Sequence, residues 1–234
     1  MKKLLLSSIA SLALFSSVLN ATEAQSIGLT AGTTGVELEY SRMINSDYNL
    51  AIRIMGGGLT YSGTYDDTDA NYDTDVDLLN FGATLEYHPF GNGFYLGVGA
   101  FYNGNSFDMV ATPKADGTYE FGGNEYSVAD VGTVDGEVVD LNNLAPYLGI
   151  GYDASLFDDG SWFFNFKAGA WYQDSPKVEL RSSNCTPNAE LLRAGVNTCD
   201  NLREDLQKEE NDINEDIKDY KWWPVLHIGV TYRF

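Results

Sequence analysis

The residues best placed to do chemistry form a run of acids in the first third of the chain. Its members are Asp66, Asp67, Asp69, Asp73 and Asp75. Spaced oxygen ligands are typical of calcium loops, but the helix-loop-helix type also needs Gly at position six and Glu at position twelve. Counted from Asp67, those positions hold Tyr72 and Leu78. We therefore predict a solvated loop that attracts cations rather than a metal site, with a looser divalent-cation site as the alternative.

A second reactive pair is Cys185 and Cys199, which are the only two cysteines and lie in one long polar stretch. In a secreted chain, two lone cysteines predict a disulfide. Closing so short a loop contributes about 3 kcal/mol in the chain-entropy model. Metal binding would need further ligands, and both histidines lie far away in the sequence.

A helix is predicted directly after the second cysteine, over residues 200–218. Four apolar residues share one of its faces: Leu202, Leu206, Ile213 and Ile217. The rest of its surface is strongly acidic. We interpret it as a solvated lid, and the alternative is a docking helix for an external partner.

Net charge restricts the partners of the chain, because its 234 residues carry a formal charge of −20. Nucleic acid is excluded as a partner, since its phosphates require a basic surface. Cationic partners are favoured, although acidic surfaces often serve only solubility.

The N-terminus has the features of a secretory signal peptide. Two lysines precede an apolar stretch that ends at Leu19, and small residues follow. We predict a signal peptide over 1–21 and a mature domain over 22–234, with cleavage after Ala24 as the alternative. No later stretch approaches the ~20 apolar residues of a spanning helix, so a membrane location would require strands.

The last thirteen residues set the frame for the rest of the chain. Leu226, Ile228, Val230, Tyr232 and Phe234 alternate with smaller or more polar residues, which predicts a strand with one apolar face. Alternation down to Tyr232 and Phe234 resembles the signal that outer-membrane barrel assembly machinery reads. A strand facing outer-membrane lipid explains the pattern, and an edge strand of a soluble sandwich is the alternative.

Short connections alternate with long ones along the chain, as periplasmic turns and external loops do in outer-membrane barrels. The long connections are predicted over 64–77, 105–140 and 174–220, and a small hairpin is expected within the second. Seven strands are clear from the alternation. Outer-membrane barrels of this kind have an even number of strands. We therefore split the first stretch into two strands at Gly32–Gly35, which predicts an all-β, eight-stranded antiparallel transmembrane barrel. One long first strand is the alternative, and a bulge is predicted at residues 56–58.

Charged residues on the inward side of these strands are the candidates for the lumen: Glu37, Glu39, Arg53, Glu86, Lys167, His227 and Arg233. An eight-stranded barrel is barely wide enough for its own side chains. A structural ion-pair network is therefore the first interpretation, and a narrow polar path that selects ions is the second.

Catalysis finds no support in the sequence. His88 falls in a predicted turn and His227 within the last strand, whereas barrel hydrolases need a histidine with carboxylates or serine near the outer rim. The chain has neither a glycine-rich phosphate loop nor a nucleophile elbow. We predict that the protein is not an enzyme and uses no cofactor.

Three sequence patches carry a family resemblance: residues 144–151 (LAPYLGIG), 175–180 (SPKVEL) and 220–225 (YKWWPV). Together with Gly32–Gly35 they resemble the CarO-like small outer-membrane barrels, the carbapenem-susceptibility-associated proteins. The resemblance implies an eight-stranded barrel with a proposed role in the uptake of basic amino acids such as ornithine. The acidic insertion with two cysteines departs from that family.

These observations predict an outer-membrane barrel of a Gram-negative bacterium that passes or binds small cationic solutes. The first alternative is a non-conducting structural or adhesive surface protein that acts through its external loops. The second is a carrier of apolar molecules with lateral exit.

Overall fold

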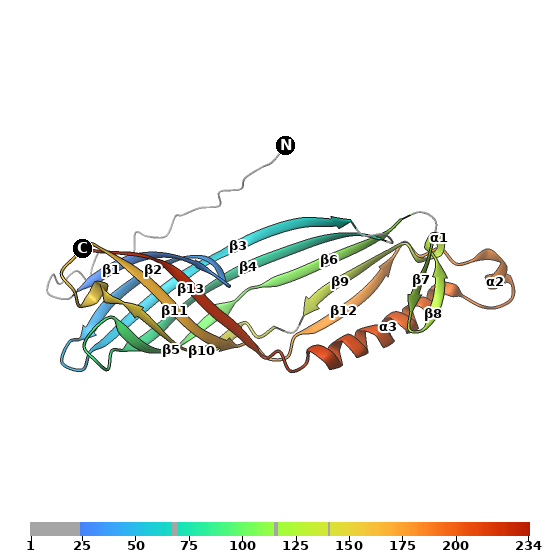
Figure 1. Cartoon of the computed structure of the whole chain (residues 1–234). Helices are drawn as coiled ribbons and strands as arrows, with labels where there is room; N and C mark the ends of the chain where they lie inside the picture. The colour runs from blue at the N-terminus through green and yellow to red at the C-terminus, as the bar shows by residue number, and fades with distance from the viewer. Residues whose placement is uncertain (1–23, 67–69, 115–116, 140) are drawn as a thin grey trace.

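Eight antiparallel strands close into a barrel in the computed structural model, which describes residues 24–66, 70–114, 117–139 and 141–234 (Figure 1). They are β1 (Gln25–Gly32), β2 (Gly35–Asn45), β3 (Leu50–Asp66), β4 (Ala70–Tyr87), β5 (Phe94–Asn103), β10 (Leu144–Asp153), β11 (Trp162–Tyr172) and β13 (Trp222–Arg233). Each pairs with its neighbours in the order β4-β3-β2-β1-β13-β11-β10-β5, and the β4–β5 pairing closes the ring. The predicted eight-stranded barrel is confirmed. The predicted signal peptide lies outside the described residues.

The first stretch forms two strands, as the even count requires. β1 pairs with β2 from Gln25 opposite Arg42 to Gly32 opposite Gly35, and β1 also pairs with β13. The alternative of one long first strand is therefore wrong. Because this hairpin is short, β3 has no paired strand on its β2 side beyond Gly58, although its pairing with β4 continues to Asp66.

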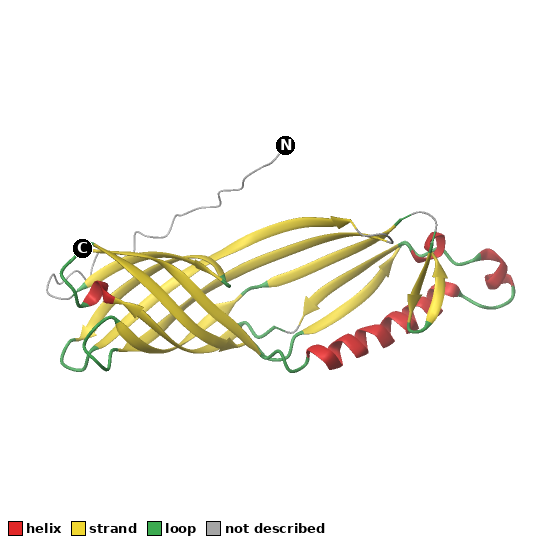
Figure 2. Ribbon diagram, viewed as in Figure 1, coloured by secondary structure: helices red, strands yellow, loops and turns green. Residues whose placement is uncertain are grey.

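Three further strands extend the wall beyond the barrel at the end that carries the long connections (Figure 2). They are β6 (Ser106–Pro113), β9 (Thr133–Val139) and β12 (Lys177–Ser183). β6 follows β5, β9 precedes β10, and β12 follows β11. Together with the parts of β3 and β4 that reach beyond the barrel, these strands make a sheet ordered β3-β4-β6-β9-β12, which we call the extension sheet. The expectation of long polar loops over 64–77 and 105–140 is corrected, because most of both segments is paired strand.

The remaining elements lie around this extension sheet. They are the hairpin of β7 (Thr118–Phe121) and β8 (Asn124–Ser127), α1 (Val128–Val131), α2 (Ala189–Arg193), α3 (Thr198–Ile217) and, at the opposite end, a 3-10 turn over Ala154–Leu156. The small hairpin and the acidic helix agree with the sequence prediction. Among the described residues, no helix is both long and apolar enough to cross a membrane.

The apolar side of the wall changes over where the barrel meets the extension sheet. In β4, Leu79, Phe81 and Leu85 face outward and are exposed. Asp73, Asp75 and Asp77 lie on the same side of β4 within the extension sheet, because side chains alternate with period two. An outer side that is apolar on the barrel suits lipid, and an outer side that is acidic on the extension sheet suits water.

The same change explains the glycines at 56–58, where a bulge was expected. Pairing of β3 with β4 runs without a shift from Leu50 opposite Tyr87 to Asp66 opposite Asn71, so the bulge prediction is wrong. A Cβ on Gly57 would lie 1.9 Å from the Val36 carbonyl oxygen of β2. The glycines allow this close approach, and the phase slip in the sequence marks the level at which the apolar side changes.

The outward apolar side chains form a belt around the barrel. Leu29, Leu38, Phe81, Leu148, Phe164 and Ile228 are between 42% and 85% exposed. At the short-turn end, Trp162 contacts Tyr232, with ring centroids 5.0 Å apart, and the Phe234 backbone N–H donates to the Gln25 carbonyl (3.2 Å). An apolar belt with aromatic ends on a closed barrel is a surface that suits lipid.

We expect the substitution Ile228→Asp to reduce folding into membranes. Ile228 is 68% exposed in the middle of β13, so a carboxylate there would face hydrocarbon. The cost should be somewhat below the about 2–4 kcal/mol that a basic residue costs at the bilayer midplane. Heat-modifiable mobility on gels measures the folded fraction, with Tyr220→Asp in the preceding loop as the control. Equal folding of the two variants would contradict the lipid-facing assignment.

Candidate functional site

The barrel interior contains a buried ion-pair network centred on Arg53 of β3. Its guanidinium donates two hydrogen bonds to the Glu86 carboxylate of β4 (2.7 and 3.2 Å). It also donates to Glu39 of β2 (2.7 Å) and Asp153 of β10 (3.2 Å). The Tyr95 ring lies over the guanidinium, 5.3 Å from ring centroid to Cζ. All five side chains are at most 2% exposed, so each charge depends on its partners.

A second cation, Lys167 of β11, extends the network towards β2. Its ammonium contacts Glu37 (2.5 Å) and Glu39 (2.7 Å), so Glu39 joins the two bases. Asn165 also donates to Glu39 (2.9 Å). His227 lies beside this group, with Nε2 3.7 Å from Glu37 and 2.6 Å from the Thr34 hydroxyl. The β1–β2 turn is thereby attached to the interior.

Of the seven lumen candidates, six lie together in this network and one does not. Arg233 is half-buried at the short-turn end, where its guanidinium donates to the Asp158 carbonyl. Four carboxylates face two permanent cations in the network, Arg53 and Lys167, and every one of these charges has a partner. Removing one of these charges would leave another buried without a partner, so the arrangement favours a structural link between strands over an ion path.

An aromatic layer fills the barrel on the long-connection side of the network. Trp171 is fully buried, and its ring centroid lies 5.2 Å from that of Phe101, which in turn lies 5.3 Å from Tyr147. Met55, Ala145, Val225 and Trp223 complete the cluster. Rings from the adjacent strands β5, β10 and β11 therefore meet inside the lumen, where Met55 of β3 and Val225 of β13 join them.

Glycines on the inward side of β10 explain how the barrel accommodates these rings. A Cβ on Gly149 would lie 2.0 Å from the Tyr147 hydroxyl, and one on Gly151 would lie 2.3 Å from the Tyr95 hydroxyl. The glycines give space to tyrosine rings from the same strand and its neighbour. These two inward glycines therefore provide the space that the Tyr147 and Tyr95 side chains occupy.

Backbone hydrogen bonds join neighbouring strands at the rim of the barrel, on the long-connection side of the aromatic layer. The Asn103 N–H donates to the Asn143 carbonyl (2.8 Å), the Asn142 N–H to the Gln173 carbonyl (2.8 Å), and the Gln173 N–H to the Lys221 carbonyl (2.9 Å). Phe107 of β6 packs against Trp223 at this level, with ring centroids 5.8 Å apart and the rings tilted. The network and the aromatic layer are two successive layers inside one narrow lumen, and the rim bonds join adjacent strands of the wall beyond them.

The extension sheet carries a strongly acidic side, which we call the acidic face. Its members are Asp73, Asp75, Asp77, Asp108, Asp135, Glu137 and Glu179. Four of them stand in register across adjacent strands, because Asp75 pairs with Asp108, Asp108 with Glu137, and Glu137 with Glu179. Like charges directly opposite one another destabilise a sheet, so this row costs stability that a bound cation would restore.

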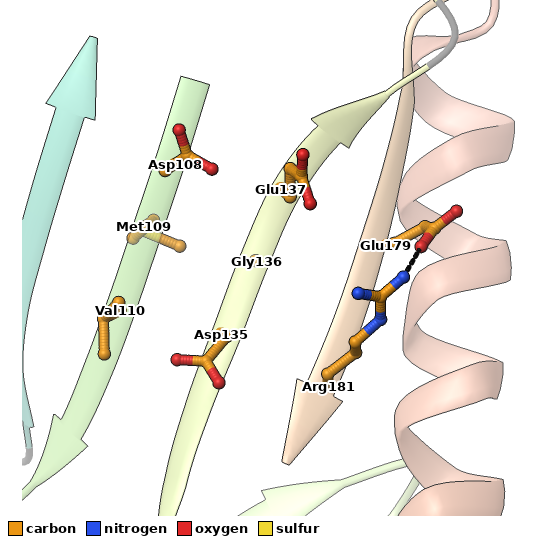
Figure 3. Close-up of a pocket in the computed structure, with 8 residues that line it drawn as sticks. All are labelled: Asp108, Met109, Val110, Asp135, Gly136, Glu137, Glu179 and Arg181. Carbon is orange, nitrogen blue, oxygen red and sulfur yellow. Dashed lines mark hydrogen bonds and ion pairs between the residues drawn. The ribbon is translucent and has the colours of Figure 1, made fainter. Parts of the chain in front are cut away.

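A small cleft of about 110 Å³ lies over the β6, β9 and β12 part of this face (Figure 3). Glu179 is paired with Arg181, and Asp135 accepts a hydrogen bond from Ser183. Within the described part of the chain, the Asp108 and Glu137 carboxylates have no hydrogen-bond or ion-pair partner. The described residues contain no group of three or more His, Cys, Asp or Glu side chains arranged to hold a metal ion.

The predicted acidic loop is divided by the structure. Asp73 and Asp75 belong to β4, and Asp66 ends β3, where it pairs with Lys114. Asp67 and Asp69 lie outside the described residues. The structured acids therefore belong to a rigid sheet rather than to a loop.

The opposite side of the extension sheet is apolar and partly covered by α3. We call it the apolar face: Leu59, Tyr61, Tyr65, Val76, Phe107, Met109, Val134 and Leu180. Leu202 and Leu206 of α3 are buried against Val134 and Leu180.

The helix is fixed at its start by two further contacts. Cys185 and Cys199 form a disulfide. Asp205 accepts hydrogen bonds from Lys208 (2.6 Å) and from the Tyr126 hydroxyl of the small hairpin. These bonds hold the pKa of Asp205 at about 2. The carboxylate therefore remains charged, and the contact intact, across the physiological pH range.

Sequence reasoning missed Asp153, Asn165 and the aromatic layer. Asp153 is the last residue of β10 and borders a turn, so the alternation within the strand did not single it out as an inward charge. The inward alternation of glycine with aromatic residues in β5 and β10 is the signal that could have indicated the filled lumen.

Solved structures with the same fold are known. The crystal structure of Acinetobacter baumannii CarO is 24% identical, covers 89% of this chain and 97% of its own, and superimposes with a TM-score of 0.59. That of Acinetobacter baumannii CarO2 is 23% identical, covers 91% and 98%, and has a TM-score of 0.58. No protein-family model and no curated protein matches the chain. The chain therefore has the fold of the CarO barrels, as the three sequence patches suggested.

Proposed function

We propose that this protein is a closed outer-membrane barrel that captures small cationic solutes at the acidic face of its extension sheet. The observation that carries the proposal is the row of four carboxylates in register, from Asp75 to Glu179. The apolar belt supports a position of the barrel in lipid, and the long connections of outer-membrane barrels are external, which favours a position of this sheet in water outside the cell. Solutes such as lysine or ornithine, with two amino groups, match adjacent carboxylates chemically.

Capture rather than passage is supported by the contents of the lumen. Two layers of described residues, the network and the aromatic layer, occupy it, and each charge of the network is paired within the barrel. An acidic surface raises the local concentration of cations, and salt screens this attraction within about 10 Å at 0.1 M. The proposal therefore includes weak, salt-sensitive binding and excludes a steady ion path.

The test is calorimetric titration of lysine into the protein in nanodiscs over a salt series. The triple variant Asp108→Asn, Glu137→Gln, Glu179→Gln should lose most of the binding heat, because it removes three of the four carboxylates in the row. Asp158→Asn with Asp159→Asn, at the other end of the barrel, is the matched control and should bind like the wild type. Equal binding by the triple variant, or none by the wild type, would refute solute capture at this face.

A further inference from the structure

The two edges of the extension sheet differ in whether their backbone hydrogen-bonding groups have partners. On the β12 edge, side chains of α3 bind the backbone: the Val178 N–H donates to Asn214 (2.7 Å), Asn214 donates to the Val178 carbonyl (3.0 Å), and the Leu180 N–H donates to Glu210 (3.2 Å). Helix side chains therefore occupy the hydrogen-bonding groups that another strand would use.

The other edge is the upper half of β3, residues 59–66, which we call the free edge. It pairs with β4 along its whole length, whereas its pairing with β2 ends at Gly58. Among the described residues, no other backbone group bonds to it. Its sequence, LTYSGTYD, contains no proline or lysine, and its register with β4 is unbroken. Proline, lysine and a bulge, three of the devices that commonly protect a strand edge, are therefore missing from it.

The backbone groups of the free edge can be assigned from the ladder. The Gly104 N–H donates to the Leu79 carbonyl, so odd-numbered residues of β4 bond towards β5 and β6, and even-numbered ones bond towards β3. Residues 61 and 63 of β3, opposite Val76 and Thr74, therefore bond to β4. Thr60, Ser62 and Thr64 direct their N–H and C=O groups outward, where an added strand would lie.

The two sides of the free edge differ in chemistry. Thr60 and Thr64 donate to Asp77 (2.6 Å) and Asp73 (2.7 Å), which holds these carboxylates towards the edge on the acidic face. On the apolar face, Tyr61 and Tyr65 are 61% and 65% exposed. An added strand would thus meet carboxylates on one side and aromatic rings on the other.

We infer that the free edge of β3 accepts an extended cationic peptide whose basic and apolar residues alternate. Main-chain hydrogen bonds to Thr60, Ser62 and Thr64 supply affinity, and the two faces supply specificity. A second copy of this chain is disfavoured by repulsion, since each copy carries a formal charge of −20. The inference deepens the proposed function, because it rests on the same acidic face and names a larger class of cationic ligand.

The test uses a labelled octapeptide of alternating lysine and valine with the protein in zwitterionic nanodiscs, and empty nanodiscs as background. Ser62→Pro removes an outward N–H without breaking the β4 ladder, so it should weaken binding at least about tenfold. Ser62→Ala keeps the N–H and should bind like the wild type. An alternating glutamate–valine peptide should not bind. Hydrogen exchange should slow at residues 60, 62 and 64 when the lysine peptide is present.

Equal binding by Ser62→Pro, or binding without slowed exchange at these amides, would overturn the inference. Slowed exchange that depends on protein concentration without peptide would assign the edge to a second copy, and would also overturn it. Ser62→Pro retains the carboxylate row, so lysine titration of this variant separates the two proposals. Loss of peptide binding with normal lysine binding supports both proposals, whereas normal binding of both peptide and lysine refutes strand addition while leaving solute capture standing.

Discussion

Replacing Arg53 with Met is expected to lower the free energy of unfolding by about 3–5 kcal/mol, because it leaves buried carboxylates without their cation. Glu39, Glu86 and Asp153 all accept hydrogen bonds from this guanidinium, and none of the three is more than 1% exposed. Chemical denaturation of the protein in detergent, followed by tryptophan fluorescence, measures the change. Most of the loss should appear as a lower denaturation midpoint with an unchanged slope.

Two further variants separate charge from geometry at this site. Arg53→Lys keeps the cation but cannot form the two parallel bonds to Glu86, so its loss should be intermediate. Arg233→Ala, at the short-turn end, is the control and should cost little, because among the described residues this side chain bonds only to a backbone carbonyl. If Arg53→Met were as stable as Arg233→Ala, the network would not hold the barrel together.

Trp171→Ala should cost a similar amount, about 3–5 kcal/mol, for a different reason. Its side chain is fully buried against Phe101 and the rest of the aromatic layer, so truncation leaves a cavity across the lumen. Trp171→Phe keeps most of the ring and removes an indole N–H that has no partner within the described protein, so its loss should be much smaller.

The matched control for this truncation is Trp222→Ala. Trp222 is 58% exposed on the outside of the barrel, where its ring contacts only one described ring, that of Tyr172. Denaturation midpoints of the three variants should fall in the order Trp171→Ala, Trp222→Ala, Trp171→Phe, from least to most stable. A Trp171→Ala midpoint equal to that of Trp222→Ala would show that the aromatic layer contributes no packing energy.

Period-two alternation made the barrel predictable, because lipid requires an apolar outer side on every strand. It also identified the inward positions of Glu39, Arg53 and Lys167. It could not identify which charges pair, since Arg53 and Asp153 are 100 residues apart in the sequence and meet only when the barrel closes. The pairing follows from strand order and stagger, which alternation within single strands does not encode.

The extension sheet was hidden from sequence reasoning for a physical reason. Above the barrel its strands place aspartates outside, and aspartate is poorly represented in strands, so residues 64–77 read as a loop. In this part of β3 and β4, apolar residues such as Tyr61 and Val76 lie on the opposite side of the wall from the outward apolar residues of the barrel. A pattern that changes side without a register shift resembles a bulge or a loop unless both neighbouring strands are seen together.

The most direct test of a closed barrel that acts at its outer sheet is a planar bilayer recording of the wild-type protein. We predict no ion-conducting steps above those of bilayers without protein, at either polarity and at low or high salt, because paired charges and packed rings fill the lumen. Stable, cation-selective steps from the folded wild type would contradict this account and establish the lumen as an ion path.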